Sequence, residues 1–182
     1  MDAGNTSRSL PGWFVTMVIG RRPMLTLARL AILIIGTWAV FSFVLTPPIR
    51  VQGISMQPTY HEGQINFLNR LAYLRHEPRR GDVVGIRFKG TEGIPMLYLK
   101  RIVGLPGETV AFENGRLFIN DEPLDEAYVN KDGCDWNMSP IKLGFDEYYV
   151  TGDNRSMQFD LHWHEKVRRQ QIVGRILFGS GS

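Results

Sequence analysis

Residues 30–49 contain no charged side chain and are long enough to cross a bilayer as a helix. A helix over residues 25–46 would rise about 30 Å, the thickness of a bilayer's hydrocarbon core. The pair Pro47-Pro48 provides its stop signal. The run is longer than a usual signal-peptide core, and no small-x-small cleavage site follows it. We therefore predict a retained transmembrane helix at residues 24–47.

The charges flanking this run predict its orientation. Three arginines crowd its N-terminal side, at Arg21, Arg22 and Arg29. Arg50 stands almost alone on the other side. By the positive-inside rule, residues 1–23 are expected in the cytoplasm and residues 48–182 outside it. The predicted partner of the helix is the lipid bilayer.

Composition narrows the function. The chain has 182 residues, which suits one domain with an appendage. A net charge of +3, part of it beside the apolar run, argues against nucleic-acid binding. Cys134 is the single cysteine, so the chain can form no internal disulfide.

Beyond residue 55 the pattern changes to short β-branched and aromatic runs between turns, such as QINFLNR, GDVVGIRF and MLYLKRIVG. This rhythm predicts an all-β domain of antiparallel strands. Asn114-Gly115 lies between alternating flanks and predicts a hairpin with a type I′ turn. Residues 120–144 are polar and poorly periodic, so we expect an excursion or lid outside the core sheet.

Ser55 is a candidate nucleophile, in the stretch GISMQPTY. A serine at neutral pH needs a base within hydrogen-bond reach. The chain has four histidines, so a Ser-His-Asp triad stays open, although none of them lies in a stretch typical of a catalytic triad. A buried lysine is the other candidate, because desolvation lowers its pKa from about 10.4 toward 7–8.

Lys100 fits that requirement. It lies in the apolar run MLYLKRIVGL, where strand alternation places it on one face with Met96 and Tyr98. Arg101 points to the opposite face, so one cation can be buried while the other pairs with a carboxylate.

His162 and His164 form an H-x-H pair that a metal could use. No other ligand cluster accompanies them, so we interpret them as structural histidines. We predict no metal and no cofactor.

Four motifs together resemble the bacterial-type signal peptidase I family of membrane-bound Ser-Lys proteases. They are SMQPT from Ser55, RRGDVV from Arg79, LKRIVGLPGE from Leu99 and GDNR from Gly152. The resemblance covers residues 51–178 and implies a signal-peptidase-like antiparallel β-fold. It also implies cleavage of signal peptides from preproteins at the bacterial inner membrane.

The resemblance implies roles residue by residue. Ser55 matches the nucleophile and Lys100 the general base. The positions that match the oxyanion site or support the pair are Gly53, Met56, Pro58, Arg101, Gly152, Asp153, Asn154, Gln158 and Asp160.

The last motif departs from the family pattern, since the chain reads GDNRSMQFDLHW. Gln158 stands where the family has a serine near the lysine amine. Leu161 replaces a second serine, and His162 replaces the arginine that would accompany Asp160. The hydroxyl that would orient the lysine is therefore missing, unless Ser156 or the Gln158 amide substitutes for it.

Two alternative functions follow from these departures. One is a dedicated maturation peptidase for a single substrate such as a conjugative pilin, with cyclisation as a conceivable outcome. The other is an inactive scaffold that binds signal sequences, with secretion-complex subunits as partners. Self-cleaving repressors also use Ser-Lys chemistry, but they are soluble and carry a DNA-binding domain that this sequence lacks.

Overall fold

The computed structural model describes residues 23–89, 95–129 and 134–178. The chain divides into two compact units, Met1–Val44 and Leu45–Ser182. Residues 1–22 of the predicted cytoplasmic segment lie outside the described residues.

Helix α2 spans Pro23–Leu45 and contains residues 30–45 of the uncharged run. By length and composition it can cross a membrane. It ends at Leu45, two residues before the predicted end, and β1 begins at Pro48. Proline lacks the N–H that would continue the helical ladder, which accounts for a stop ahead of Pro47-Pro48. Assignment of α2 as a membrane span stays a prediction.

Residues 48–178 contain a seven-stranded sheet in the order β1-β2-β11-β3-β4-β9-β10. Every neighbouring pair is antiparallel. The strands are β1 (Pro48–Arg50), β2 (Ile65–Asn69), β3 (Val83–Lys89), β4 (Pro95–Gly104), β9 (Glu147–Thr151), β10 (Glu165–Arg168) and β11 (Ile172–Ile176). Two short 3₁₀ turns flank β10, η1 (Phe159–Leu161) and η2 (Arg169–Gln171). The predicted fold class, an all-β domain behind one N-terminal helix, is confirmed.

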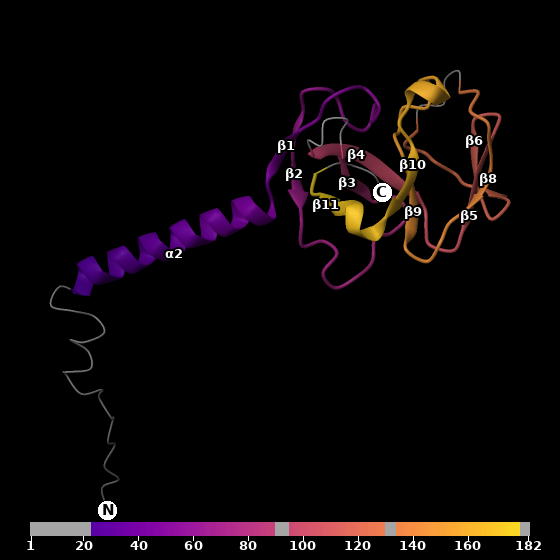
Figure 1. Cartoon of the computed structure of the whole chain (residues 1–182). Helices are drawn as coiled ribbons and strands as arrows, with labels where there is room; N and C mark the ends of the chain where they lie inside the picture. Colours follow the sequence, from indigo (N-terminus) through magenta and orange to yellow (C-terminus); the bar gives the residue numbers. More distant parts are fainter. Residues whose placement is uncertain (1–22, 90–94, 130–133, 179–182) are drawn as a thin grey trace, which may run out of the picture. The chain divides into compact units, whose positions relative to one another are not determined.

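A second antiparallel sheet has the order β7-β6-β5-β8. Its strands are β5 (Thr109–Glu113), β6 (Arg116–Ile119), β7 (Glu122–Pro123) and β8 (Met138–Lys142). Figure 1 shows β5, β6 and β8 gathered at one end of the unit, beyond β9 and β10. The hairpin at Asn114-Gly115 forms as predicted: φ is 48° and 75°, and Glu113 pairs with Arg116.

The described part of residues 120–144 lies outside the seven-stranded sheet but is not an unstructured loop. It supplies β7 and β8 to the smaller sheet. It also supplies Trp136 and Leu143, both buried among the side chains of β5 and β6. Isolated buried residues between polar neighbours give no periodic signal, so the sequence pattern did not show these contacts.

Strand β4 links the two sheets. Its Ile102 side chain belongs to the core of the seven-stranded sheet, whereas the adjacent Val103 packs with β5 and β6. Successive strand residues face opposite sides, so one strand can serve both cores. A third cluster around Met56, Tyr60 and Leu68 packs the β1–β2 loop onto the sheet.

The hairpin turn gives a stability prediction. In Gly115→Ala the new Cβ would overlap the carbonyl oxygen of Cys134 and would require a positive φ. We expect a loss of about 2 kcal/mol or more in the free energy of unfolding, measured by denaturant titration of the full chain in detergent. Asn114→Gly is the matched control, since glycine suits a φ of 48°, and it should be nearly neutral. Equal effects of the two substitutions would contradict this account.

Candidate active site

Three segments far apart in the sequence meet at one place. The β1–β2 loop carries Ser55, β4 carries Lys100, and the end of β9 leads into Gly152. Register fixes the last two, because Arg101 pairs with Thr151 across β4 and β9. The backbone N–H of Asn154 donates to the Ser55 carbonyl oxygen at 3.0 Å and ties the loop to the end of β9.

The Lys100 Nζ atom lies 2.9 Å from Ser55 Oγ. Lys100 is 2% exposed, and burial lowers its pKa from 10.5 to about 8. The Asp153 carboxylate opposes this shift, and the nearby Arg155 charge assists it. The lysine amine is therefore much closer to neutrality at physiological pH than an exposed lysine would be.

Aromatic rings lie beside the amine. The Trp163 ring stacks on Tyr98, with centroids 5.0 Å apart, and its centroid is 6.0 Å from Lys100 Nζ. Tyr98 and Lys100 therefore share a face of β4, as strand alternation predicted. The Trp163 ring is part of the surroundings that bury the amine, and burial is the main cause of its lowered pKa.

Arg101 pairs with Asp153 on the other face of β4. Its Nε and Nη2 donate to the two carboxylate oxygens at 2.8 and 2.6 Å, and both side chains are 1% exposed. Thr59 Oγ1 donates to the same carboxylate at 2.5 Å. The Asp153 carboxylate thus connects three segments: β4, the turn after β9 and the β1–β2 loop that carries Ser55.

Gly152 lets the chain pass close to Ser55. A Cβ at this position would overlap the Ser55 carbonyl oxygen and lie 2.5 Å from His162 Nε2. The Asn154 side chain donates its Nδ2–H to the Ile54 carbonyl oxygen at 3.1 Å. Gly152, Asp153 and Asn154 all lie at the Ser55–Lys100 pair.

The remaining loop residues surround Ser55. Met56 is buried in the cluster with Tyr60 and Leu68. Pro58 is exposed and follows a cis peptide bond. Gly53 is exposed with a φ of 81°, and its N–H donates to Glu62 Oε1 at 3.4 Å. The Gly53 N–H therefore points to a carboxylate of its own loop.

The structure does not bring Gln158 and Asp160 to the pair. Both side chains are exposed at η1, and Gln158 contributes its carbonyl oxygen to the turn. His162 lies closer: it is 2% exposed, and its Nε2 is 3.4 Å from the Ser55 carbonyl oxygen. The sequence around His162 does not predict this contact. The single signal at this position is that a histidine replaces the family's arginine.

Sequence reasoning also missed a buried ion pair behind the site. Arg155 Nη2 donates to Glu126 Oε1 at 2.8 Å, with both side chains 1% exposed. Tyr128 donates to the same carboxylate oxygen, and its ring lies 3.8 Å from the Arg101 guanidinium. Glu126 lies in the irregular 120–144 segment, 29 residues before Arg155, so only the folded chain reveals the pair.

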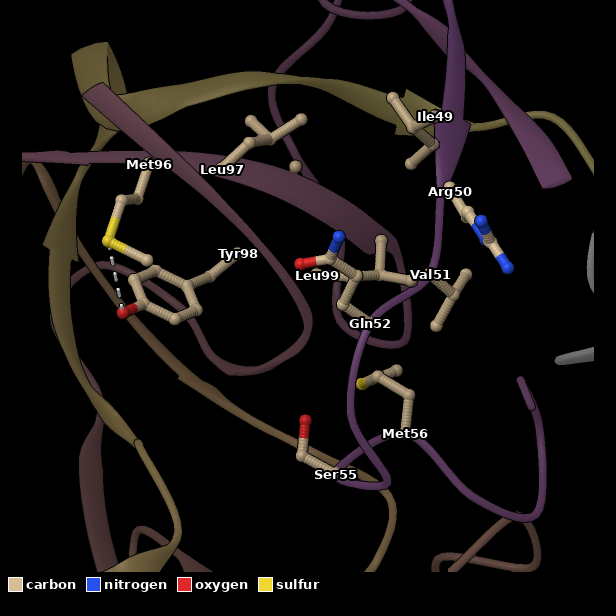
Figure 2. A pocket seen from close by; sticks show the side chains of 11 residues that line it. Ile49, Arg50, Val51, Gln52, Ser55, Met56, Met96, Leu97, Tyr98 and Leu99 are labelled. Atoms are coloured by element: carbon tan, nitrogen blue, oxygen red, sulfur yellow. Dashed lines mark hydrogen bonds between the residues drawn. The ribbon is translucent and has the colours of Figure 1, made fainter. Parts of the chain in front are cut away.

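A cleft of about 360 Å³ opens beside Ser55. One wall comes from residues 49–52 and the other from residues 96–99 of β4. Figure 2 shows the Ser55 hydroxyl directed toward the space between Tyr98 and Gln52. Arg50 points away from that space.

Within the described residues, no group of three or more His, Cys, Asp or Glu side chains is placed to hold a metal ion. The His162 and His164 rings are separated by 6.5 Å between centroids, and each packs against Trp136.

Comparison with known proteins identifies the family. The family model of signal peptidases, peptidase S26, matches residues 24–179. The chain is 39% identical over 128 residues to signal peptidase I of Leptolyngbya laminosa, covering 66% of this chain and 62% of that protein. It is 35% identical over 138 residues to signal peptidase I P of Bacillus subtilis subsp. natto, covering 71% and 72% respectively. The chain belongs to the signal peptidase family, peptidase S26.

A solved structure adds a weaker likeness. The crystal structure of a signal peptidase I from Enterococcus faecalis V583 aligns with a TM-score of 0.41 at 23% identity. The alignment covers 54% of this chain and 96% of that one.

The Glu126–Arg155 pair gives a second stability prediction. Glu126→Gln leaves the buried Arg155 charge without its counter-ion, so we expect a loss of about 3 kcal/mol or more in the free energy of unfolding. Asp125→Asn is the control, because Asp125 is exposed, and it should change little. Denaturant titration of both variants tests this, and a near-neutral Glu126→Gln would show that Arg155 does not depend on the pair.

Proposed function

We propose that this chain is a membrane-anchored serine endopeptidase that cleaves signal peptides from exported preproteins with a Ser55–Lys100 dyad. The 2.9 Å contact between the Ser55 hydroxyl and a buried lysine amine carries the proposal. Family membership and the names of the relatives support the substrate class. The aligned region covers 62% of the Leptolyngbya relative, so its activity enters here as a proposal for this chain.

The chemistry follows from the pair. In its neutral form, Lys100 accepts the Ser55 hydroxyl proton while Oγ bonds to the scissile carbonyl carbon. The resulting ammonium then protonates the amine that leaves as the C–N bond breaks. This step yields an acyl-enzyme ester on Ser55. Water hydrolyses the ester, with Lys100 again taking a proton and returning it to Oγ.

The negative oxygen formed on the substrate needs donors. We assign this role to the Ser55 main-chain N–H. The Gly53 N–H is engaged with Glu62, so Gly53 contributes through backbone shape rather than as a donor. A bound water would supply a second hydrogen bond.

The cleft fits an extended peptide. Residues 95–101 of β4 pair with β3, whereas β9 pairs only with β4 residues between 101 and 104. The other edge of residues 96–99 therefore faces the cleft, where a substrate strand can add to the sheet. Close walls on both sides favour small side chains next to the scissile bond.

Membrane anchoring would bring enzyme and substrate together. A single span at α2 confines the chain to the surface where signal peptides emerge, which raises the effective concentration of both. The arginine asymmetry supports a cytoplasmic N-terminus and an extracytoplasmic β-domain at a bacterial inner membrane.

The two alternatives are not favoured. The relatives reported above are named signal peptidase I, which points to signal peptide cleavage rather than to a pilin-specific or scaffolding role. Gln158 is exposed and does not replace the family's hydroxyl, yet Lys100 Nζ still lies 2.9 Å from Ser55 Oγ, which favours an active pair over a scaffold.

Ser55→Ala and Lys100→Ala should each abolish cleavage of a model preprotein by the detergent-solubilised full chain, monitored by gel shift and mass spectrometry. The variants remove the nucleophile and the base in turn. Ser139→Ala and Lys142→Ala, both at exposed positions of β8, are matched controls that should retain activity. Wild-type-like cleavage by either dyad variant would refute the mechanism.

The dyad also predicts a pH profile. Only the neutral amine can accept the proton, so kcat/KM should rise about tenfold per pH unit below the Lys100 pKa and level off above it. That pKa is about 8 in the folded chain. Initial rates from about pH 6 to pH 9 test this, and a flat profile would contradict a lysine base.

Orientation is testable by cysteine labelling in spheroplasts. In a Cys134→Ser background, Phe145→Cys places a thiol at a position that is 95% exposed, and a membrane-impermeant maleimide should label it. Ser9→Cys should be labelled only after permeabilisation. The reverse pattern would overturn the proposed topology.

A further inference from the structure

The main chain at Ser55 is held from its carbonyl side. The Ser55 carbonyl oxygen accepts from the Asn154 N–H at 3.0 Å and lies 3.4 Å from His162 Nε2. The preceding carbonyl, of Ile54, accepts from Asn154 Nδ2 at 3.1 Å. These contacts fix the peptide plane from which the Ser55 side chain projects.

His162 is suited to donate there in only one form. Burial lowers its pKa to about 3, and the nearby Lys100 charge adds to the shift, so the ring is neutral. A neutral imidazole has a single N–H. Placing it on Nε2 satisfies the Ser55 carbonyl oxygen, and it leaves Nδ1, which has no partner within the described residues, as a buried lone pair.

The surroundings hold the ring in that place. The His162 ring lies edge-on to Trp136, with centroids 4.8 Å apart. Its backbone N–H closes the η1 turn on the carbonyls of Gln158 and Phe159. The missing Cβ of Gly152 leaves the space that Nε2 occupies. The packing on Trp136, the turn at η1 and the absence of a Cβ at Gly152 together hold His162 Nε2 at the Ser55 carbonyl oxygen.

We propose that His162 is a positioning residue for the nucleophile: through its Nε2–H it holds the Ser55 carbonyl and so orients the Ser55 hydroxyl toward Lys100. The inference rests on the proposed function. In this proposal the supporting residue holds Ser55 rather than Lys100. Gln158, which stands where the family has the hydroxyl near the lysine, is exposed. His162 does not touch the reacting atoms in this role and exchanges no proton.

A role in packing alone makes different predictions. If the ring only fills space against Trp136, an apolar side chain of similar volume would preserve the rate, and stability would be the quantity that changes. If the donor matters, the rate should follow the presence of an N–H at that point.

Two substitutions separate these roles. His162→Leu removes the donor and keeps apolar volume, whereas His162→Gln keeps an amide N–H at a similar reach. We expect His162→Leu to lower kcat by about 10-fold to 100-fold with KM changed less than about twofold, because a displaced nucleophile affects the chemical step. His162→Gln should recover most of that loss.

His164→Leu is the matched control. The His164 ring also packs on Trp136, and its Nδ1 lies 2.7 Å from the Tyr149 hydroxyl, away from Ser55. We expect it to lower the Tm while leaving kcat within about twofold of wild type.

We would measure kcat and KM for preprotein cleavage by each full-length variant in detergent, together with its Tm. These values distinguish a positioning role from a packing role. Wild-type kcat in His162→Leu would overturn the proposal. So would equal losses in His162→Leu and His162→Gln that follow their Tm, as a packing role requires. If wild type cleaves no faster than Ser55→Ala, the proposed function itself fails, and the positioning role falls with it. If only the positioning role is wrong, the wild type still cleaves the preprotein and Ser55→Ala still does not.

Discussion

Removal of water from one amine is the condition on which the proposed chemistry depends. Lys100 is held on β4 between β3 and β9, where the strands and the Trp163 ring leave it almost no solvent. A carboxylate nearby would normally restore its charge. Asp153 is close enough to act in that direction, but both of its oxygens are engaged by Arg101, and Thr59 donates to one of them. The pKa of the amine therefore stays lowered, at about 8, although an acidic group lies nearby.

The serine reaches this amine because its loop is fastened on several sides. Met56 anchors the loop in the hydrophobic cluster with Tyr60 and Leu68. Thr59 connects it to the Asp153 carboxylate, and Asn154 binds two of its carbonyls. Most of these donors come from the turn after β9, so the register of β9 against β4 sets the geometry of the pair. A shift of β9 by one residue in that register would turn its side chains to the opposite faces of the sheet and displace the turn that binds the loop.

Part of this arrangement was predictable. Strand alternation assigned Tyr98 and Lys100 to one face and Arg101 to the other, and the folded chain follows it. The Asn114-Gly115 turn was also predictable from the sequence, because few residue types adopt the positive φ values that this turn requires. The smaller sheet was not, since β7 has two residues and Trp136 is a single buried side chain in a polar segment. The resemblance named Gln158 and Asp160 as supports, yet both lie at the surface.

The sequence by itself determined the uncharged span, the all-β rhythm and the choice of Ser55 and Lys100, because these depend on local composition and on motifs read along the chain. Tertiary structure decided which groups surround the pair. Glu126 meets Arg155, and His162 meets the Ser55 carbonyl, across 29 and 107 residues of sequence. Such contacts arise from strand register and from packing between the two sheets. Neither leaves a periodic trace in the residues that make them.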